Sequence, residues 1–274
     1  MSSISDDQSL FLGPLPKPTI FVPSKINKYL KPCQQNVVRF LYTHYFQKDG
    51  GILSDKRDLH DVLPLVVFIS SLIHTVDNVK VLLIINEETK DRLNLWLNYF
   101  SHVDVEHYRI KYCATNETKY CSEDGRQPCI YFVKAKRCDA HIQFFKKNKW
   151  TLIIYDNFDN KHNSLTNILN SVKDLTSECR FVVSRESIFH SNKYFWSLFQ
   201  FIGKTTLLAK TWKEFDQSEY KHYFNKVDRD NSGHMTKIDI YKTLEATRIR
   251  FEYVSRNVEC SGDKVHENEP WSNY

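Results

Sequence analysis

The order of apolar and polar residues predicts that strands and helices alternate along most of the chain. Short runs rich in β-branched and aromatic residues indicate buried strands. These runs lie at residues 79–85, 129–133, 150–156 and 180–184. Longer segments with apolar residues three and four positions apart indicate helices that bury one face. These segments lie at residues 34–46, 91–100, 164–172 and 194–202.

The segment LPLVVFISSLI at residues 63–73 is apolar on all sides, which predicts a helix buried in the core. Pro64 is tolerated only in the first turn of such a helix. Strands that alternate with helices are typical of a doubly wound α/β domain around a parallel sheet. We therefore predict one α/β domain over residues 23–254, a loose proline-rich lead-in at 1–22 and a polar tail at 255–274.

The composition is typical of an intracellular globular protein. Of 274 residues, 41% are hydrophobic and 14% aromatic, which is enough for a sizeable core. The net charge of +5 permits an acidic partner such as nucleic acid but does not require one. Seven cysteines without a preceding signal peptide indicate reduced thiols inside a cell. No stretch approaches the ~20 uncharged apolar residues of a membrane span, so we expect no membrane partner.

Ligands of a parallel α/β sheet bind beyond the carboxyl ends of its strands. Three such ends can be located in the sequence. They are the loop after GGIL at residues 50–53, the segment IIYDNFD after the strand at Trp150, and the segment VVSRESIFHSN after the strand at Arg180.

Together with the helix before them, these segments resemble the motifs of the Swi/Snf-type chromatin-remodelling ATPases of helicase superfamily two. LKPCQQNVVRFLY resembles LRPYQxxGVxFL and places Gln34 at the family's adenine-sensing glutamine. GGILSDKRDLHDVL, which begins at Gly50 and Gly51, aligns without a gap on GGILxDxMGLGKTx. WTLIIYDNFDN resembles WDxVIxDEAHxx, and RFVVSRESIFHSNKYFWSLFQFI resembles RxxLTGTPIQNxxxELWSLxxFL. The resemblance covers about residues 30–256 and implies a RecA-like lobe, a parallel sheet with helices on both faces.

The phosphate loop departs from the family pattern at the residues that would hold ATP. Asp58 and His60 replace two glycines, Asp61 stands at the lysine position, and Val62 stands at the magnesium-binding threonine. The family's lysine meets the β and γ phosphates. A charge pair at ~4 Å and an effective dielectric constant of ~20 is worth about 4 kcal/mol. Aspartate in place of lysine turns that attraction into a comparable repulsion.

The acidic box departs in the same way. Asp156 matches the family's magnesium-associated aspartate, but Asn157 stands at the catalytic glutamate and Asp159 at the histidine. An amide cannot accept the proton of an attacking water at neutral pH. The family's TGTP is replaced by SRES at residues 184–187, and the chain ends after one lobe, whereas the motors bind ATP between two. The resemblance therefore implies a degenerate lobe without ATPase activity and without a cofactor.

A basic cluster in VKAKRCDAHIQFFKKNKW is a candidate contact for a nucleic-acid backbone. The family's first lobe presents this side to DNA, and lysine and arginine neutralise phosphates. The same residues could equally form the solvated face of a helix beside Trp150. The cluster consists of Lys134, Lys136, Arg137, Lys146, Lys147 and Lys149.

The segment FNKVDRDNSGHMTKIDIYKTL resembles a calcium-binding EF-hand loop. Asp228, Asp230 and Ser232 occupy loop positions one, three and five, and Asp239 occupies position twelve, which is normally a bidentate glutamate. One unpaired motif favours a chance match over a calcium site. Zinc is not indicated either, because zinc ligands come in closely spaced pairs. The cysteines at 113, 121, 129 and 138 are more widely spaced.

The sequence thus predicts a non-catalytic binding module in the nucleus, in contact with chromatin proteins, DNA or both. Two alternatives remain open from the residues alone. One is an ATPase that a partner completes, and the other is a calcium-dependent regulatory protein.

Overall fold

The structure is a computed structural model, and it describes thirteen stretches of the chain. They are residues 9–13, 20–48, 50–54, 62–86, 90–103, 105–106, 109–113, 129–156, 171–172, 174–184, 192–203, 211–217 and 254–255.

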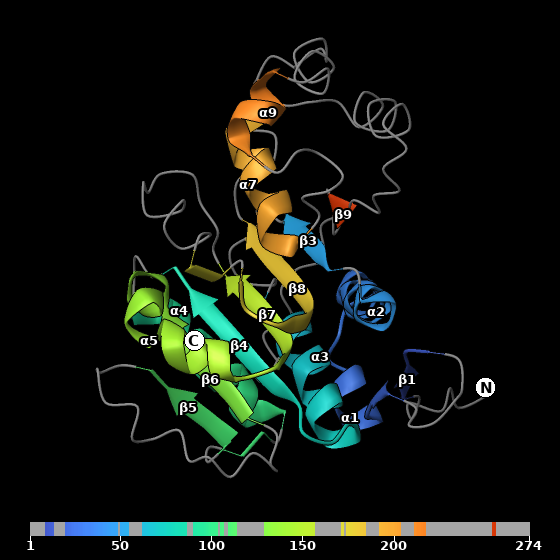
Figure 1. Cartoon of the computed structure of the whole chain (residues 1–274). Coiled ribbons are helices and arrows are strands. Elements are labelled where there is room, and N and C mark those ends of the chain that lie inside the picture. Colours follow the sequence, from blue (N-terminus) through green and yellow to red (C-terminus); the bar gives the residue numbers. More distant parts are fainter. Residues whose placement is uncertain are drawn as a thin grey trace, which may run out of the picture.

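A seven-stranded sheet forms the centre of the molecule (Figure 1). Every neighbouring pair of its strands is parallel, which confirms the predicted parallel sheet. In spatial order the strands are β5 (Ile110–Tyr112), β6 (Cys129–Lys134), β4 (Lys80–Ile85), β7 (Trp150–Asp156), β8 (Ser177–Ser184), β3 (Gly51–Ser54) and β9 (Val254–Ser255).

Helices cover both faces of the sheet, as the α/β pattern predicts. The described helices are α1 (Ser24–Asn27), α2 (Pro32–Gln47), α3 (Val62–Thr75), α4 (Lys90–His102), α5 (Cys138–Lys147), α7 (Asn192–Ile202) and α9 (Trp212–Gln217), with a 3-10 turn η3 (Ala135–Arg137). The helix predicted at 164–172 lies outside the described residues except for its last two.

Alternate residues of each central strand contribute to two separate hydrophobic clusters. On β7, Leu152 and Ile154 pack into the cluster that contains α2, α3 and α4. Ile153 and Tyr155 pack into the cluster that contains α5, α7 and α9. Successive side chains of a strand point to opposite faces, so a strand buried on both faces must be apolar throughout.

Helix α3 is the central helix of the first cluster. All of its residues from Val62 to Ile73 are buried. Its two buried serines are satisfied internally, because Ser70 Oγ donates to Val103 O at 3.1 Å and Ser71 Oγ to Val67 O at 2.9 Å. Pro64 lies in the first turn, as predicted. None of the described helices is long and apolar enough to cross a bilayer.

The N-terminal region differs from the predicted loose lead-in at 1–22. Strand β1 (Leu10–Phe11) pairs antiparallel with β2 (Phe21–Val22). Its apolar residues on the inner side, Leu10, Leu12, Ile20 and Val22, are buried in the first cluster. Each strand lies in a run of only three apolar residues, Leu10 to Leu12 and Ile20 to Val22, which is too short to indicate a strand between prolines. At the other end, β9 pairs with β3, so Ser255 lies in the sheet rather than in the predicted tail.

Two glycines with left-handed backbones provide a matched test of packing near β3. Gly50 has φ +69° and Gly203 has φ +83°. A Cβ atom on Gly50 would lie 2.6 Å from Arg180 O, whereas one on Gly203 would meet open space. We expect Gly203→Ala to lower the free energy of unfolding by about 1 kcal/mol, the cost of the backbone conformation. Gly50→Ala should cost about 1–3 kcal/mol more, because β8 must shift. Urea unfolding measures both, and equal losses would contradict the described contact.

Candidate functional site

The carboxyl ends of the central strands meet at one edge of the sheet. In register, Lys134 of β6 lies beside Ile85 of β4, which lies beside Asp156 of β7. Ser54 of β3 lies beside Ser184 of β8. A doubly wound sheet binds ligands at this end of its strands. Asp156, which matches the family's magnesium-associated aspartate, lies there.

Asp156 is completely buried at this edge and accepts three hydrogen bonds from helix α4. Arg92 Nη2 donates to Oδ1 at 2.6 Å, and Arg92 Nε donates to Oδ2 at 2.8 Å. Trp96 Nε1 also donates to Oδ2, at 2.6 Å. The backbone is fixed as well, because Asn86 N donates to Asp156 O at 3.1 Å.

These bonds give Asp156 a different chemistry from that of an exposed metal ligand. Arg92 is itself only 4% exposed, so the ion pair is bidentate and desolvated. Such pairs are strongly oriented, and removing one partner leaves an uncompensated buried charge. Both carboxylate oxygens accept hydrogen bonds from Arg92 or Trp96. A divalent ion would need the lone pairs of these oxygens for coordination. The arrangement binds α4 to the end of β7.

Two other residues that match the family's nucleotide site have structural roles here. The Gln34 side chain is buried, and its Oε1 accepts a hydrogen bond from Lys31 N at 2.9 Å. This contact caps the N-terminus of α2, where backbone N–H groups lack helical partners. Val62 is fully buried in the first cluster and offers no oxygen to a metal ion. The sequence motifs located both residues, but they did not predict these contacts.

Gly50 and Gly51 lie at the opposite edge of the sheet. Gly50 precedes β3 and Gly51 begins it, so both are at the amino end of that strand. A strand's length therefore separates both glycines from the carboxyl ends of the strands, where a doubly wound sheet binds ligands. The remaining residues of the predicted site, Asp61 and Asn157, lie outside the described residues, as do Asp58, His60 and Asp159.

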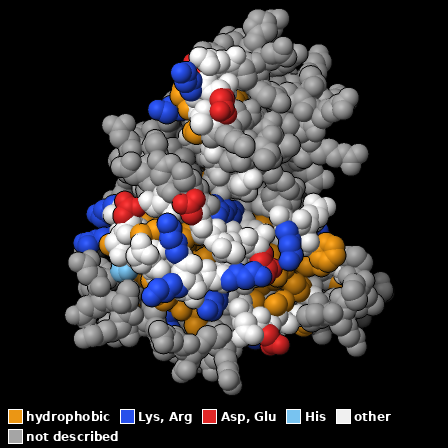
Figure 2. Space-filling model, viewed as in Figure 1, with side chains coloured by type: hydrophobic (Ala, Val, Ile, Leu, Met, Phe, Trp, Pro, Cys, Tyr) orange, Lys and Arg blue, Asp and Glu red, His pale blue; other side chains and the backbone are white. Residues whose placement is uncertain are grey.

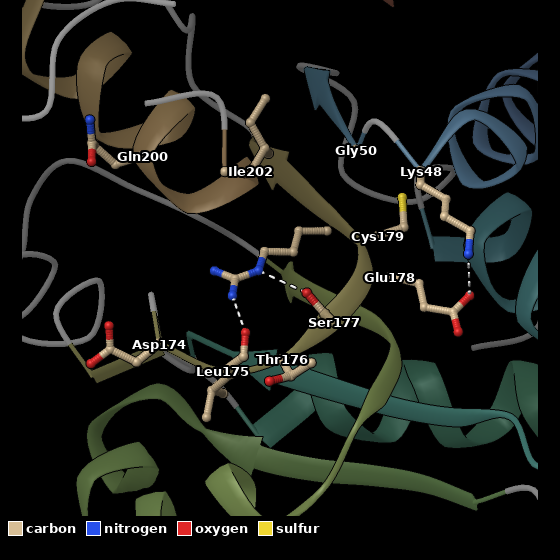
Figure 3. A pocket seen from close by; sticks show the side chains of 12 residues that line it. Lys48, Gly50, Asp174, Leu175, Thr176, Ser177, Glu178, Cys179, Gln200 and Ile202 are labelled. Atoms are coloured by element: carbon tan, nitrogen blue, oxygen red, sulfur yellow. Dashed lines mark hydrogen bonds and ion pairs between the residues drawn. The ribbon is translucent and has the colours of Figure 1, made fainter. Parts of the chain in front are cut away.

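The amino edge contains a pocket of about 570 Å³ that the sequence did not indicate (Figure 3). Arg180 lies in its wall and donates to Leu175 O at 2.5 Å, Ser177 Oγ at 2.9 Å and Phe201 O at 3.3 Å. Burial lowers the pKa of this guanidinium from its ordinary value. These bonds tie the start of β8 to the end of α7, so Arg180 is used within the fold rather than offered to a ligand.

The predicted basic cluster is divided between the two ends of α5. Lys134, Lys136 and Arg137 lie at the carboxyl edge of the sheet, before the helix, and the other lysines lie near its C-terminus. Lys146 Nζ is 3.9 Å from Asp174, and Lys149 Nζ is 3.8 Å from Glu178. Figure 2 shows basic side chains spread over this face with acidic ones among them. A ten-residue helix is about 15 Å long, so the six residues form two groups.

The described cysteines are packing residues. Cys113, Cys138 and Cys179 are buried, and Cys129 is half-buried. Burial raises the pKa of Cys179 to about 12 and raises that of Cys138 as well. Within the described residues, no group of His, Cys, Asp and Glu side chains could hold a metal ion. The EF-hand-like residues Asp228, Asp230, Ser232 and Asp239 lie outside the described part of the chain.

Comparison with known proteins shows to which family the chain belongs. A family model described as the SNF2-related domain matches residues 33–247. The chain belongs to the SNF2-related domain family. A curated relative, Protein CHROMATIN REMODELING 24 of Arabidopsis thaliana, is 27% identical over 250 residues. The match covers 83% of this chain and 22% of the relative, so the chain spans about a fifth of that relative's length.

Solved structures agree with this assignment at the level of the fold. The SWI2/SNF2 ATPase core of Sulfolobus solfataricus in complex with double-stranded DNA matches with a TM-score of 0.60 and 19% identity, over 80% of this chain and 43% of that one. The same core domain alone matches with a TM-score of 0.60 and 20% identity, over 81% and 42%. The predicted RecA-like α/β fold is thereby confirmed for a single Snf2-type lobe.

The buried ion pair can be tested by double-mutant analysis. Arg92→Met and Asp156→Asn should each lower the free energy of unfolding by about 3–5 kcal/mol, because each leaves one buried charge uncompensated. The double variant should lose less than the sum, since it removes both charges and keeps an acceptor for Trp96. Urea unfolding curves give the coupling.

Arg109→Met is the matched control for this cycle. Arg109 forms a more exposed pair with Glu106, with 20% and 52% of the side chains accessible. Its loss should cost at most about 1 kcal/mol. Additive effects of the Arg92 and Asp156 variants would show that the buried pair is not coupled as described.

Proposed function

We propose that this SNF2-related lobe is a non-catalytic binding module that acts on chromatin in the nucleus. The observation that carries the proposal is the engagement of Asp156 by Arg92 and Trp96. A working site needs this carboxylate to face a metal ion and its phosphates. Here the guanidinium supplies the positive charge, and the side chain is closed to solvent.

The residues around Asp156 support the same reading. The threonine position is the buried Val62, the lysine position is Asp61, and the glutamate position is Asn157. The first change removes a metal ligand, the second repels a triphosphate, and the third removes a proton acceptor. A partner that completed the site would have to replace these three groups and also break a buried ion pair.

The setting is inferred from the relatives. The Arabidopsis relative carries chromatin remodelling in its name, and one Sulfolobus core was solved with double-stranded DNA. A lobe of this family that binds without hydrolysing ATP would contribute a docking surface to nuclear assemblies. We favour protein partners over DNA, because the basic residues form two groups that are separated by the length of α5.

We expect the purified chain to release no phosphate from ATP above background in the presence of magnesium. Its melting temperature should be unchanged by millimolar MgATP, because a ligand that binds the folded state would raise it. Asp61→Lys alone should not restore turnover, since Val62, Asn157 and the engaged Asp156 remain. A coupled phosphate-release assay and thermal melting measure the two effects.

The decisive contrary result would be magnesium-dependent turnover that co-elutes with the protein and disappears in Asn157→Ala. This variant is preferable to Asp156→Ala, which is expected to unfold the lobe. Direct binding of DNA would give a different result. Duplex affinity would fall steeply with salt and would weaken when Lys134 and Arg137 are changed to glutamate.

A further inference from the structure

A small apolar notch opens at the carboxyl edge of the sheet, on the side of β5 and β6. It has a volume of about 60 Å³ and is enclosed by the ends of β4, β5 and β6 and by the first turn of α4. Its lining includes the apolar side chains of Ile85, Leu93, Tyr112 and Phe132, and Lys134 lies at its border. None of the described residues that line the notch belongs to β3.

The walls of the notch combine a rigid base with an accessible aromatic rim. Phe132 is buried, and the Tyr112 ring stacks on it with centroids 5.7 Å apart and an interplanar angle of 25°. Tyr112 is nevertheless 42% exposed, among the most exposed large hydrophobic residues described. Leu93 is half-buried on α4. The notch is large enough for one apolar side chain of a partner molecule.

The border of the notch is basic. Lys134 is in register with Ile85, and the turn η3 follows it at once with the exposed residues Lys136 and Arg137. Within the described part of the chain, no ion pair joins Lys136 or Arg137 to a carboxylate. The nearby Asp139 accepts a hydrogen bond from Ser171 Oγ. Apolar surface beside positive charge is complementary to an acidic segment with an apolar anchor.

We propose that this notch docks a short acidic segment of a partner protein, with one aliphatic side chain inserted between Tyr112 and Leu93. Carboxylates beside the anchor in the segment pair with Lys136 and Arg137 of the turn η3. The inference rests on the proposed function as a binding module and names the chemistry of its partner. A DNA backbone would use the charges but would leave the apolar notch empty.

The test uses a fluorescein-labelled peptide in which one leucine is flanked by aspartates and glutamates, and a second peptide with serine in place of the leucine. Fluorescence anisotropy at about 0.1 M salt, where the Debye length is about 10 Å, should show the leucine peptide binding about tenfold more tightly, the value of one buried aliphatic anchor. The variant Lys136→Glu/Arg137→Glu should abolish binding of both. Tyr112→Ser should reduce only the preference for leucine.

The matched control is Lys146→Glu/Lys147→Glu, which makes the same charge change at the other end of α5. Circular dichroism checks that each variant is folded, and we expect this control to bind within about twofold of the natural chain because its charges lie more than a Debye length away. Equal affinity for the two peptides, or equal loss in both charge variants, would overturn the proposal. A DNA duplex that binds more tightly and ignores Tyr112→Ser would assign the surface to nucleic acid. Phosphate release from ATP would instead refute the non-catalytic function and leave the peptide measurement standing.

Discussion

The pairing of Arg92 with Asp156 constrains both the packing and the chemistry of this lobe. A buried charge is tolerated only when a partner and hydrogen bonds compensate it. Because β7 lies at the centre of the sheet, the pair fixes α4 to the central strand. Trp96 then buries its ring against Phe100 and Phe132 while its N–H reaches the carboxylate. The same bonds engage both oxygens of the carboxylate at that end of the strand.

The residues that match the family are largely those that build its core. Trp150 and Leu198 are fully buried in the cluster on the α5 and α7 face. Leu53 is buried in the other cluster. These positions are constrained by volume and shape, since interiors are close-packed. Packing also constrains three positions of the nucleotide site, because Gln34, Val62 and Asp156 are buried as well.

Most of the sheet could be predicted from the sequence because its central strands are apolar on both faces. Runs such as KVLLII and WTLIIYD leave no other stable placement. The short strands were missed for the opposite reason. β5 has three residues and β1 and β2 have two, which is too few for a period to be recognised.

The site was less predictable because its contacts join residues far apart in the sequence. Asp156 could be found by its motif, but its partner Arg92 lies on another element and has no local signature. The basic cluster shows the converse error. Its residues are close together in the sequence, yet α5 separates them, so that one group lies at the carboxyl ends of the strands and the other at the amino ends. Basic residues that are close in the sequence therefore need not be close on the surface of the folded protein.

The pairing of β3 with β9 has a consequence for how the protein is made. Leu53 of β3 lies beside Val254 of β9, so the partners are about 200 residues apart in the chain. During translation, β3 emerges long before β9 and must wait with one backbone edge uncovered. An uncovered strand edge is a template for pairing with other chains. The nascent lobe therefore exposes this side of β3 until residues 254–255 have been made, and during that interval it is open to pairing with other chains.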